Sequence, residues 1–166
     1  RHYIGGLVSL APEMTAFYAP TVNSYKRYVP GVWAPLTASW GIENRTCAVR
    51  VIAGGAGTRV EQRQTGADIN PYIAMAACLG AGMYGVENAL EPAAPTEGDA
   101  SAPAAGGPSI PGTLDDAVRA LEASQKAREI LGESFVDHFL RTRDWEARQA
   151  RRAISEWELR RYFEAI

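Results

Sequence analysis

Apolar and small residues recur at helical spacing over residues 2–10, which predicts a helix at the start of the chain. Pro12 opens a second short helix, and Ala19-Pro20 stops it because proline disfavours helix in the residue before it. A long apolar helix begins at Asn70-Pro71, where proline in the first helical position loses no hydrogen bond. Between these helices lie three β-rich runs, at residues 36–40, 47–52 and 59–63. The pattern predicts an α+β fold, in which an antiparallel sheet is backed by helices.

Turn-forming residues separate these elements. Gly54-Gly55-Ala56-Gly57 joins the second and third β-rich runs and predicts an antiparallel hairpin. The same run lacks the Lys-Ser/Thr tail and the following helix of a phosphate-binding loop, so we interpret it as a turn. Residues 21–35 contain Pro30, Gly31 and Pro35, which predict a structured loop rather than a helix or strand.

Residues 91–166 contain a segment with loop-forming composition followed by a segment with helical patterning. Residues 91–111 are rich in Ala, Pro, Gly and Ser and contain no Lys or Arg, which predicts a flexible surface loop. Thr113 then resembles a helix N-cap, with Asp115 and Asp116 in the first turn, where negative charge favours a helix. Aromatic residues at helical spacing after this point predict two or three amphipathic helices over residues 113–166.

Length, charge and cysteine use narrow the class of protein. A chain of 166 residues can bury one core. A net charge of −2 argues against a nucleic-acid partner, which would require a basic patch. The apolar stretch 71–86 suits a buried helix better than a membrane helix, so we expect no membrane partner. Cys47 and Cys78 lack C-x-x-C spacing, which favours reduced, buried thiols in a cytoplasmic protein.

A charged run in the third β-rich segment is the strongest sign of chemistry. Arg59, Glu61 and Arg63 alternate along it, so in a strand their side chains share one face. Arginines bind phosphates and carboxylates through a fixed fork of donors, and a carboxylate between them suits a cation such as magnesium. The run therefore favours a site for nucleotide phosphate and metal. A strand face covered by salt bridges is the alternative interpretation.

Three further motifs accompany the charged run. Residues 23–31 read N-S-Y-K-R-Y-V-P-G, residues 44–46 read N-R-T with Arg50 shortly after, and Asn70-Pro71-Tyr72 precedes an alanine-rich run. Together, and in this order, these motifs resemble those of the glutamine synthetase family along most of the chain. The resemblance implies that residues 1–166 are the C-terminal part of a catalytic domain, with most metal ligands upstream. We therefore expect a fragment of a longer enzyme that is inactive alone, and a ring-shaped homo-oligomer for the intact protein.

The resemblance also implies a role for each arginine. Arg27 and Arg63 match the residues that hold the carboxylates of glutamate, a task that suits a bidentate guanidinium. Arg45 matches the catalytic residue that stabilises the transferring phosphoryl group. Arg50 and Arg59 match contacts to the phosphates of ATP. Taken singly, each would be better explained as a surface ion pair.

The implied chemistry also needs a metal. Glu61 matches a ligand of Mg²⁺ or Mn²⁺, which would bridge the nucleotide phosphates. The reaction implied is phosphorylation of the γ-carboxylate of glutamate by ATP, followed by attack of an amine or ammonia on the acyl phosphate. The product would be a γ-glutamyl amide.

Two departures from the ammonia-using pattern point to an organic amine. Those family members carry a glutamate in G-x-E-A-P, where this chain has Trp33 before Ala34-Pro35. An indole cannot take a proton from ammonium, but it offers a cation–π surface to an organic ammonium. The stretch G-A-D-I-N-P at residues 66–71 also resembles the γ-glutamyl amine ligases. An ammonia-using enzyme, in which Trp33 only packs the loop, and a non-catalytic structural or sensing relative remain as alternatives.

Overall fold

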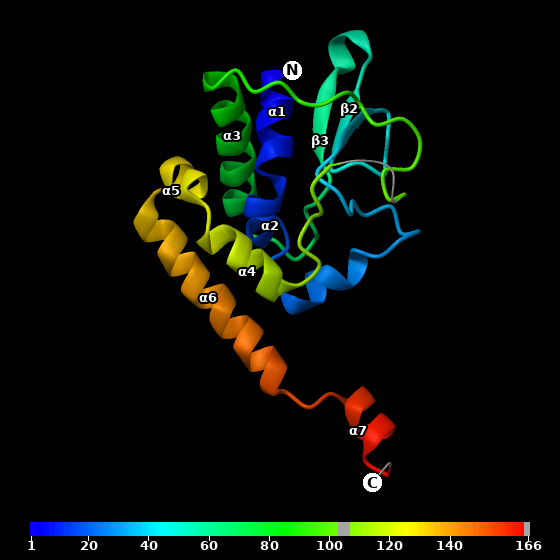
Figure 1. The fold of residues 1–166 in the computed structure, drawn as a ribbon, viewed down its shortest axis with the longest axis vertical. Coiled ribbons are helices and arrows are strands. Elements are labelled where there is room, and N and C mark those ends of the chain that lie inside the picture. Colours follow the sequence, from blue (N-terminus) through cyan, green and yellow to red (C-terminus); the bar gives the residue numbers. More distant parts are fainter. Residues whose placement is uncertain (103–106, 165–166) are drawn as a thin grey trace.

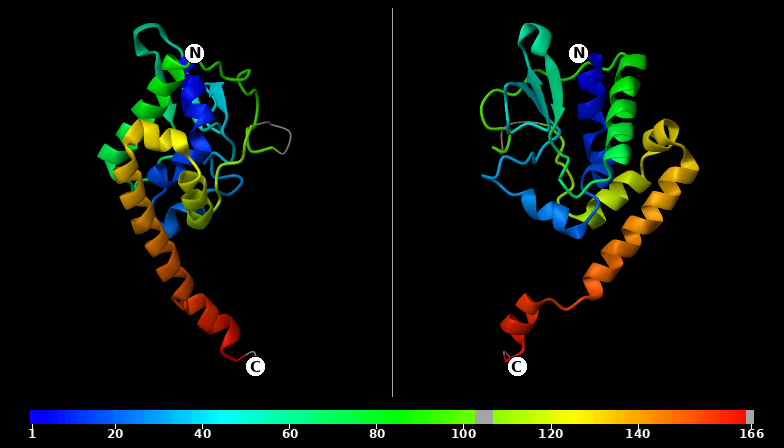
Figure 2. Two further views of the ribbon diagram at one scale, coloured as in Figure 1. Left: turned by 60° about the vertical axis from the view of Figure 1, so that its left-hand side comes forward. Right: turned by 180° about the vertical axis from the view of Figure 1, so that it is seen from behind.

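The computed structural model describes residues 1–102 and 107–164, which form a helical layer packed beside a small sheet (Figure 1). Helix α1 lies between α3 and the sheet in the views of Figures 1 and 2. The predicted helices at the start of the chain and after Asn70 are confirmed. Their bounds are α1 His2–Ser9, α2 Ala11–Tyr18 and α3 Pro71–Glu87.

Helices α1 and α3 pack closely because glycines line their contact. A Cβ atom on Gly6 would lie 2.0 Å from the carbonyl oxygen of Ala81, and one on Gly85 would lie 2.2 Å from that of His2. The ring of Tyr3 fills the equivalent space above Gly82. The two helix backbones therefore approach to a distance that larger side chains would prevent.

The sheet has three strands in the order β1-β2-β3, where β1 is Trp40–Ile42, β2 is Val49–Ile52 and β3 is Arg59–Gln62. The predicted hairpin is confirmed, because β2 and β3 are antiparallel and are joined through a short 3-10 helix, η2 Gly55–Gly57. Strand β1 differs from the prediction because it lies parallel to β2. Only the six residues 43–48 connect these two parallel strands.

The first β-rich run, residues 36–40, contributes only Trp40 to the sheet. The residues before it pair with a later segment: Thr37 forms an isolated antiparallel bridge with Ser109, and the amide of Ala38 donates to Pro108. These bonds satisfy the main chain of this segment away from β2, so the sheet is mixed rather than antiparallel.

The C-terminal part forms four helices, one more than the largest number predicted. They are α4 Leu114–Glu122, α5 Gln125–Leu131, α6 Glu133–Arg152 and α7 Glu156–Tyr162. Thr113 caps α4 as predicted, with its hydroxyl accepting from the amide of Asp116. Ser124 caps the start of α5. Gly132, at φ 87°, ends α5 and separates it from α6, so these end residues divide a continuous amphipathic pattern into separate helices.

The core lies where the N-terminal helices meet the sheet and helices α4 and α6. Phe17, Tyr18 and Leu121 are almost fully buried there. Helix α7 has no buried residue and extends away from the body (Figures 1 and 2). Both cysteines are free. None of the helices in the described residues is long and apolar enough to cross a membrane.

A candidate active site rich in arginine

Glu61 of strand β3 is the centre of the site. Its carboxylate lies 3.2 Å from Arg50, 3.6 Å from Arg59 and 4.0 Å from Arg63. The alternation of Arg59, Glu61 and Arg63 thus places the three side chains together, and Arg50 joins them because its residue pairs with Glu61 across the hairpin. The strand face is therefore covered by salt bridges, as the alternative interpretation of this run expects. Glu61 and Arg63 also line a cavity of about 630 Å³.

Arg50 is enclosed by two carboxylates. Its guanidinium donates to Glu61 on one side and to Glu43 on the other, and its side chain is only 15% exposed. The hydrogen bond to Glu43, together with the charges of Glu43 and Glu61, raises the pKa of Arg50 above its ordinary value. Both ends of this guanidinium are therefore occupied. Glu43 is not among the site residues predicted from the sequence.

Arg27 is held by the main chain of the neighbouring segment. It ends the 3-10 helix η1 Val22–Arg27, and its guanidinium donates to the carbonyls of Thr65 (2.7 Å), Arg63 (2.8 Å) and Gln64 (3.1 Å). Its Nε is buried without a partner in the described residues. Arg27 thus fixes the chain that follows β3 while its side chain lines the same cavity as Glu61.

Arg63 links two loops to the sheet. Its Nε donates to the carbonyl of Arg45 at 3.0 Å, and its Nη2 donates to the carbonyl of Trp33 at 3.1 Å. Burial, the largest influence, lowers the pKa of Arg63, in part offset by the negative charge of Glu61. Arg63 therefore sets the positions of two other predicted site residues, Trp33 and Arg45.

Arg45 has the least committed guanidinium of the five arginines. Within residues 1–102 and 107–164 its side chain makes no hydrogen bond or ion pair, and it rests over the indole of Trp33 with 5.8 Å between the guanidinium carbon and the ring centroid. Arg59, by comparison, donates to the carbonyl of Gly57 and pairs with Glu61. The five donors of Arg45 are therefore available to an anion.

Trp33 separates two cavities. The first contains Glu61 and Arg63, and the second, of about 740 Å³, contains Arg45; the indole borders both. Trp33 is 58% exposed, and its φ of 58° is uncommon for a residue with a side chain. A ligand that spans Glu61 and Arg45 would have to pass this indole.

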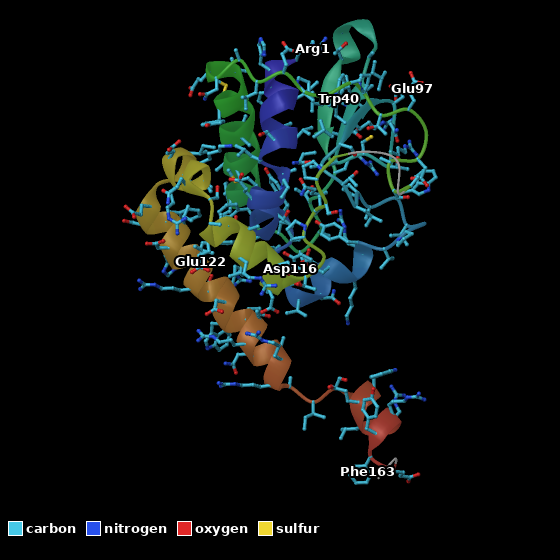
Figure 3. All side chains as sticks on the ribbon, in the orientation of Figure 1. Arg1, Trp40, Glu97, Asp116, Glu122 and Phe163 are labelled. Atoms are coloured by element: carbon cyan, nitrogen blue, oxygen red, sulfur yellow. The ribbon has the colours of Figure 1, made fainter. Side chains whose placement is uncertain are left out.

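One side of the second cavity is lined by a segment that we call the strap, residues 93–100. The strap runs along β1, where Trp40 Nε1 donates to the carbonyl of Ala93 at 2.7 Å and the amide of Thr96 donates to Trp40 at 2.8 Å. In Figure 3, Trp40 lies on the sheet side and Glu97 at the outer edge. These bonds define the path of a stretch predicted to be a flexible loop. They do not test its flexibility.

Asn44 and Thr46, on either side of Arg45, also reach the strap. Both residues belong to the N-R-T motif, but the motif by itself predicts no role for them. An Asn followed two residues later by Thr is a common signal for a turn closed by the Asn side chain, which could have drawn attention to them.

The described residues do not form a complete metal site. They contain no group of three or more His, Cys, Asp or Glu side chains placed to hold a cation. Glu61 is the carboxylate of the first cavity and is surrounded by arginines. A metal at Glu61 would need further ligands from outside these residues.

Comparison with known proteins gives a consistent result. A family model described as "Glutamine synthetase, catalytic domain" matches residues 1–162. The chain is 47% identical to type-1 glutamine synthetase 2 of Dictyostelium discoideum over 100% of the chain and 32% of that protein. It is 40% identical to a glutamate–isopropylamine ligase of a Pseudomonas species, over 99% of the chain and 36% of the relative.

A further relative and a solved structure extend this result. The chain is 40% identical to the γ-glutamylethanolamide synthetase GlnA4 of Streptomyces coelicolor, over 100% of the chain and 36% of that protein. A structure of a GmaS–ADP complex superposes with a TM-score of 0.86 at 34% identity, over 98% of the chain and 39% of GmaS. The chain thus spans about a third of the length of these curated relatives.

Proposed function

This chain belongs to the glutamine synthetase family, and we propose that the complete protein is an ATP-dependent ligase that joins glutamate to an amine. In the first step, a γ-carboxylate oxygen of glutamate attacks the γ-phosphorus of ATP and ADP leaves. In the second, the amine nitrogen attacks the γ-carbonyl carbon, phosphate leaves, and the nitrogen loses a proton. The product is a γ-glutamyl amide.

The observation that carries the proposal is the free guanidinium of Arg45. In phosphoryl transfer, charge develops on the equatorial oxygens, and donors that are already in place stabilise it. Among residues 1–102 and 107–164 no group accepts a hydrogen bond from the Arg45 guanidinium, while its carbonyl is fixed by Arg63. A fixed main chain together with an uncommitted guanidinium supports Arg45 as the catalytic residue that stabilises the transferring phosphoryl group.

The other arginines are proposed to bind the substrates. Arg27 and Arg63 both line the first cavity, and guanidinium groups suit the carboxylates of glutamate. Arg50 and Arg59, on either side of Glu61, are proposed contacts for the phosphates of ATP. Glu61 is proposed as one ligand of Mg²⁺ or Mn²⁺, a cation that would offset phosphate charge when bound.

For the acceptor we favour an organic amine over ammonia. Trp33 presents a half-exposed indole at the border of the two cavities and already holds one cation, the guanidinium of Arg45. An alkylammonium suits such a surface better than ammonium does, because it can also bury carbon against the ring. Relatives named for isopropylamine and for ethanolamide support this choice, whereas those named glutamine synthetase support ammonia.

The test is glutamate-dependent release of phosphate from ATP by the complete protein, with ammonia, methylamine, putrescine, ethanolamine and aniline as acceptors. Turnover with an organic amine and little with ammonia is the expected result. Strong turnover with ammonia would make Trp33 a packing residue and the protein an ammonia-using synthetase. No turnover with any acceptor would overturn the ligase and favour a structural or sensing relative.

A further inference from the structure

The turn that carries Arg45 is bonded to the strap on both sides. We propose that Asn44 and Thr46 are positioning residues that lock Arg45 to the strap, so that the strap contributes to the rate of phosphoryl transfer. This inference rests on the proposed function of Arg45. It assigns a role to two polar side chains, and to the loop they grip, that the arginines alone do not explain.

Asn44 uses its whole amide group in this lock. Its Oδ1 accepts from the amide of Thr46 at 3.0 Å and from the hydroxyl of Thr46 at 2.6 Å. Its Nδ2 donates to two strap carbonyls, that of Thr96 at 3.0 Å and that of Gly98 at 2.8 Å. A primary amide can make about four such bonds, so the side chain has no capacity left for a ligand. Its function is therefore to hold the turn to the strap.

Thr46 completes the lock from the other side of Arg45. Its hydroxyl donates to Asn44 Oδ1 and accepts from the amide of Ala100 at 2.8 Å. The strap is therefore gripped at three points by the residues immediately before and after Arg45. Its other end is held to β1 by the indole of Trp40.

The packing beneath the lock leaves no room for the turn to shift toward the sheet. A Cβ atom added to Gly41 would lie 2.8 Å from Asn44 Cβ and 2.8 Å from the carbonyl oxygen of Thr96. On the remaining side, Arg63 holds the carbonyl of Arg45. The main chain of Arg45 is thus fixed from three directions, whereas its guanidinium makes no polar contact in the described residues.

A fixed main chain with a free guanidinium is what a preorganised phosphoryl contact requires. Catalytic donors are effective when they need no rearrangement in the transition state, and a shift of about 1 Å can lower a rate by about 100-fold. If the strap moved away, Asn44 and Thr46 would lose their partners and the turn would no longer be held in one position. The strap is thereby coupled to the chemistry without touching a substrate.

The first test is Asn44→Asp in the complete protein. An aspartate keeps the acceptor for Thr46 but turns an oxygen toward the two strap carbonyls, which repel it. We expect kcat for glutamate-dependent phosphate release to fall by about 10- to 100-fold while KM for glutamate stays within about twofold. Hydrogen exchange at the strap amides should become faster. Asn88→Asp is the matched control, because in the part of the chain that the structure describes the Asn88 side chain donates to the carbonyl of Tyr84 in α3 and has no bond to the strap.

A second pair of variants tests the same bonds without adding the negative charge that Asn44→Asp introduces. Thr46→Val has nearly the same shape but no hydroxyl, so it loses the bonds to Ala100 and Asn44. It should lower kcat and speed strap exchange as Asn44→Asp does. Thr46→Ser restores the hydroxyl and should recover most of the wild-type kcat.

The outcomes separate this inference from the function it rests on. Faster strap exchange with unchanged kcat in both Asn44→Asp and Thr46→Val would overturn the positioning role and leave the ligase intact. A rise in KM for glutamate at constant kcat would also overturn it, because the lock would then serve binding alone. A wild-type protein with no glutamate-dependent phosphate release would overturn the proposed function, and the role of the lock with it.

Discussion

At the scale of single residues, the five arginines differ in what their guanidinium groups already hold. Arg27 and Arg63 bind main-chain carbonyls, and Arg50 binds two carboxylates. Arg59 is shared between a carbonyl and Glu61, and Arg45 holds no polar partner in the described residues. The planar fork of arginine suits all of these tasks, but a lysine could replace it in few of them.

We therefore predict that Arg45→Lys lowers kcat for phosphate release by about 100- to 1,000-fold, because an ammonium cannot present the same fork to the equatorial oxygens. KM for glutamate should change little. Steady-state kinetics of the complete protein measure both. Arg148→Lys, in an exposed ion pair of α6, is the control and should behave as wild type. A fall in kcat of less than about threefold would contradict the role of Arg45.

Sequence reasoning could place some of these residues and not others. Alternation along one strand was sufficient to bring Arg59, Glu61 and Arg63 together, because the strand period is local. The carbonyls held by Arg27 lie more than 35 positions away in the chain. Nothing in a sequence shows which main-chain oxygen a guanidinium will meet. The hydrogen bonds of Arg27 and Arg63 to main-chain carbonyls can therefore be known only from the structure.

At the scale of elements, the sequence predicts helix starts more accurately than it predicts the pairing of strands. Proline and asparagine at residues 70–71 marked the start of α3 correctly, because a cap and its helix are neighbours in sequence. Strand β1 was placed too early and expected to be antiparallel, since its parallel partner and the competing contact of Thr37 with Ser109 are set by the tertiary fold. The capping box at Ser155 begins a fourth helix that the amphipathic pattern did not separate.

The α1–α3 contact predicts a large effect of a single methyl group. Gly85→Ala would place a Cβ atom within 2.4 Å of the main chain of Gly6, so the helices would have to separate. We expect the free energy of unfolding to fall by about 1–3 kcal/mol. Gly112→Ala, at a position with no atom within 4 Å of the added Cβ, should change it by less than about 0.5 kcal/mol. Denaturant unfolding of both variants measures the difference, and equal midpoints would contradict the contact.

The hydrogen bonds between Asp68 and η1 should make a pH-dependent contribution to the stability of the fold. Burial would raise the pKa of Asp68, but hydrogen bonds from Ser24 and Thr21 outweigh it, so the pKa lies below its ordinary value. The charged form therefore stabilises the fold above about pH 4, and this contribution is lost as the pH falls through the lowered pKa. Because Asp68 is exposed to solvent, which screens its charge, Asp68→Asn should cost only about 0.5–1 kcal/mol at pH 7.

The effect of the same substitution should shrink as the pH falls through the lowered pKa of Asp68, because its carboxyl then becomes neutral like the asparagine side chain. Unfolding by denaturant at pH 7 and at pH 2 provides the comparison. Asp144→Asn, in an exposed pair on α6, serves as the control and should change the free energy of unfolding little at pH 7. A destabilisation by Asp68→Asn that is equal at both pH values would show that the charge of Asp68 is not responsible.

At the scale of the whole molecule, two apolar surfaces are exposed. One face of α3 carries large side chains that are 46–78% exposed: Tyr72, Met75, Leu79, Met83 and Val86. Helix α7 adds Trp157 and Tyr162, and Phe163 follows at the far end of the extended segment (Figure 3). Surfaces of this kind usually contact other protein. The homo-oligomer expected from the sequence would cover such surfaces, as would the residues that the relatives have outside the matched third.

The extended C-terminal segment predicts that stability and assembly can be separated. No described residue after Arg152 is buried, so a deletion of residues 153–166 removes no core contact made by residues 153–164. We expect the midpoint of denaturant unfolding of this chain to change by less than the error of the measurement. A lower midpoint would show that the segment packs on the body. Size-exclusion chromatography of the complete protein with the same deletion would show whether the segment acts in self-association.

The short connection between β1 and β2 limits the insertions and deletions that this chain can accept between the two strands. Loops normally tolerate insertions, yet residues 43–48 must reverse the chain twice to join parallel neighbours, and parallel strands usually need a crossover of about twelve residues or more. An inserted residue would break the grip on the strap, and a deleted one would pull β1 out of register with β2. A change in the length of this segment is therefore unfavourable, and substitution is tolerated only at positions other than Arg45 and the two residues that bond it to the strap.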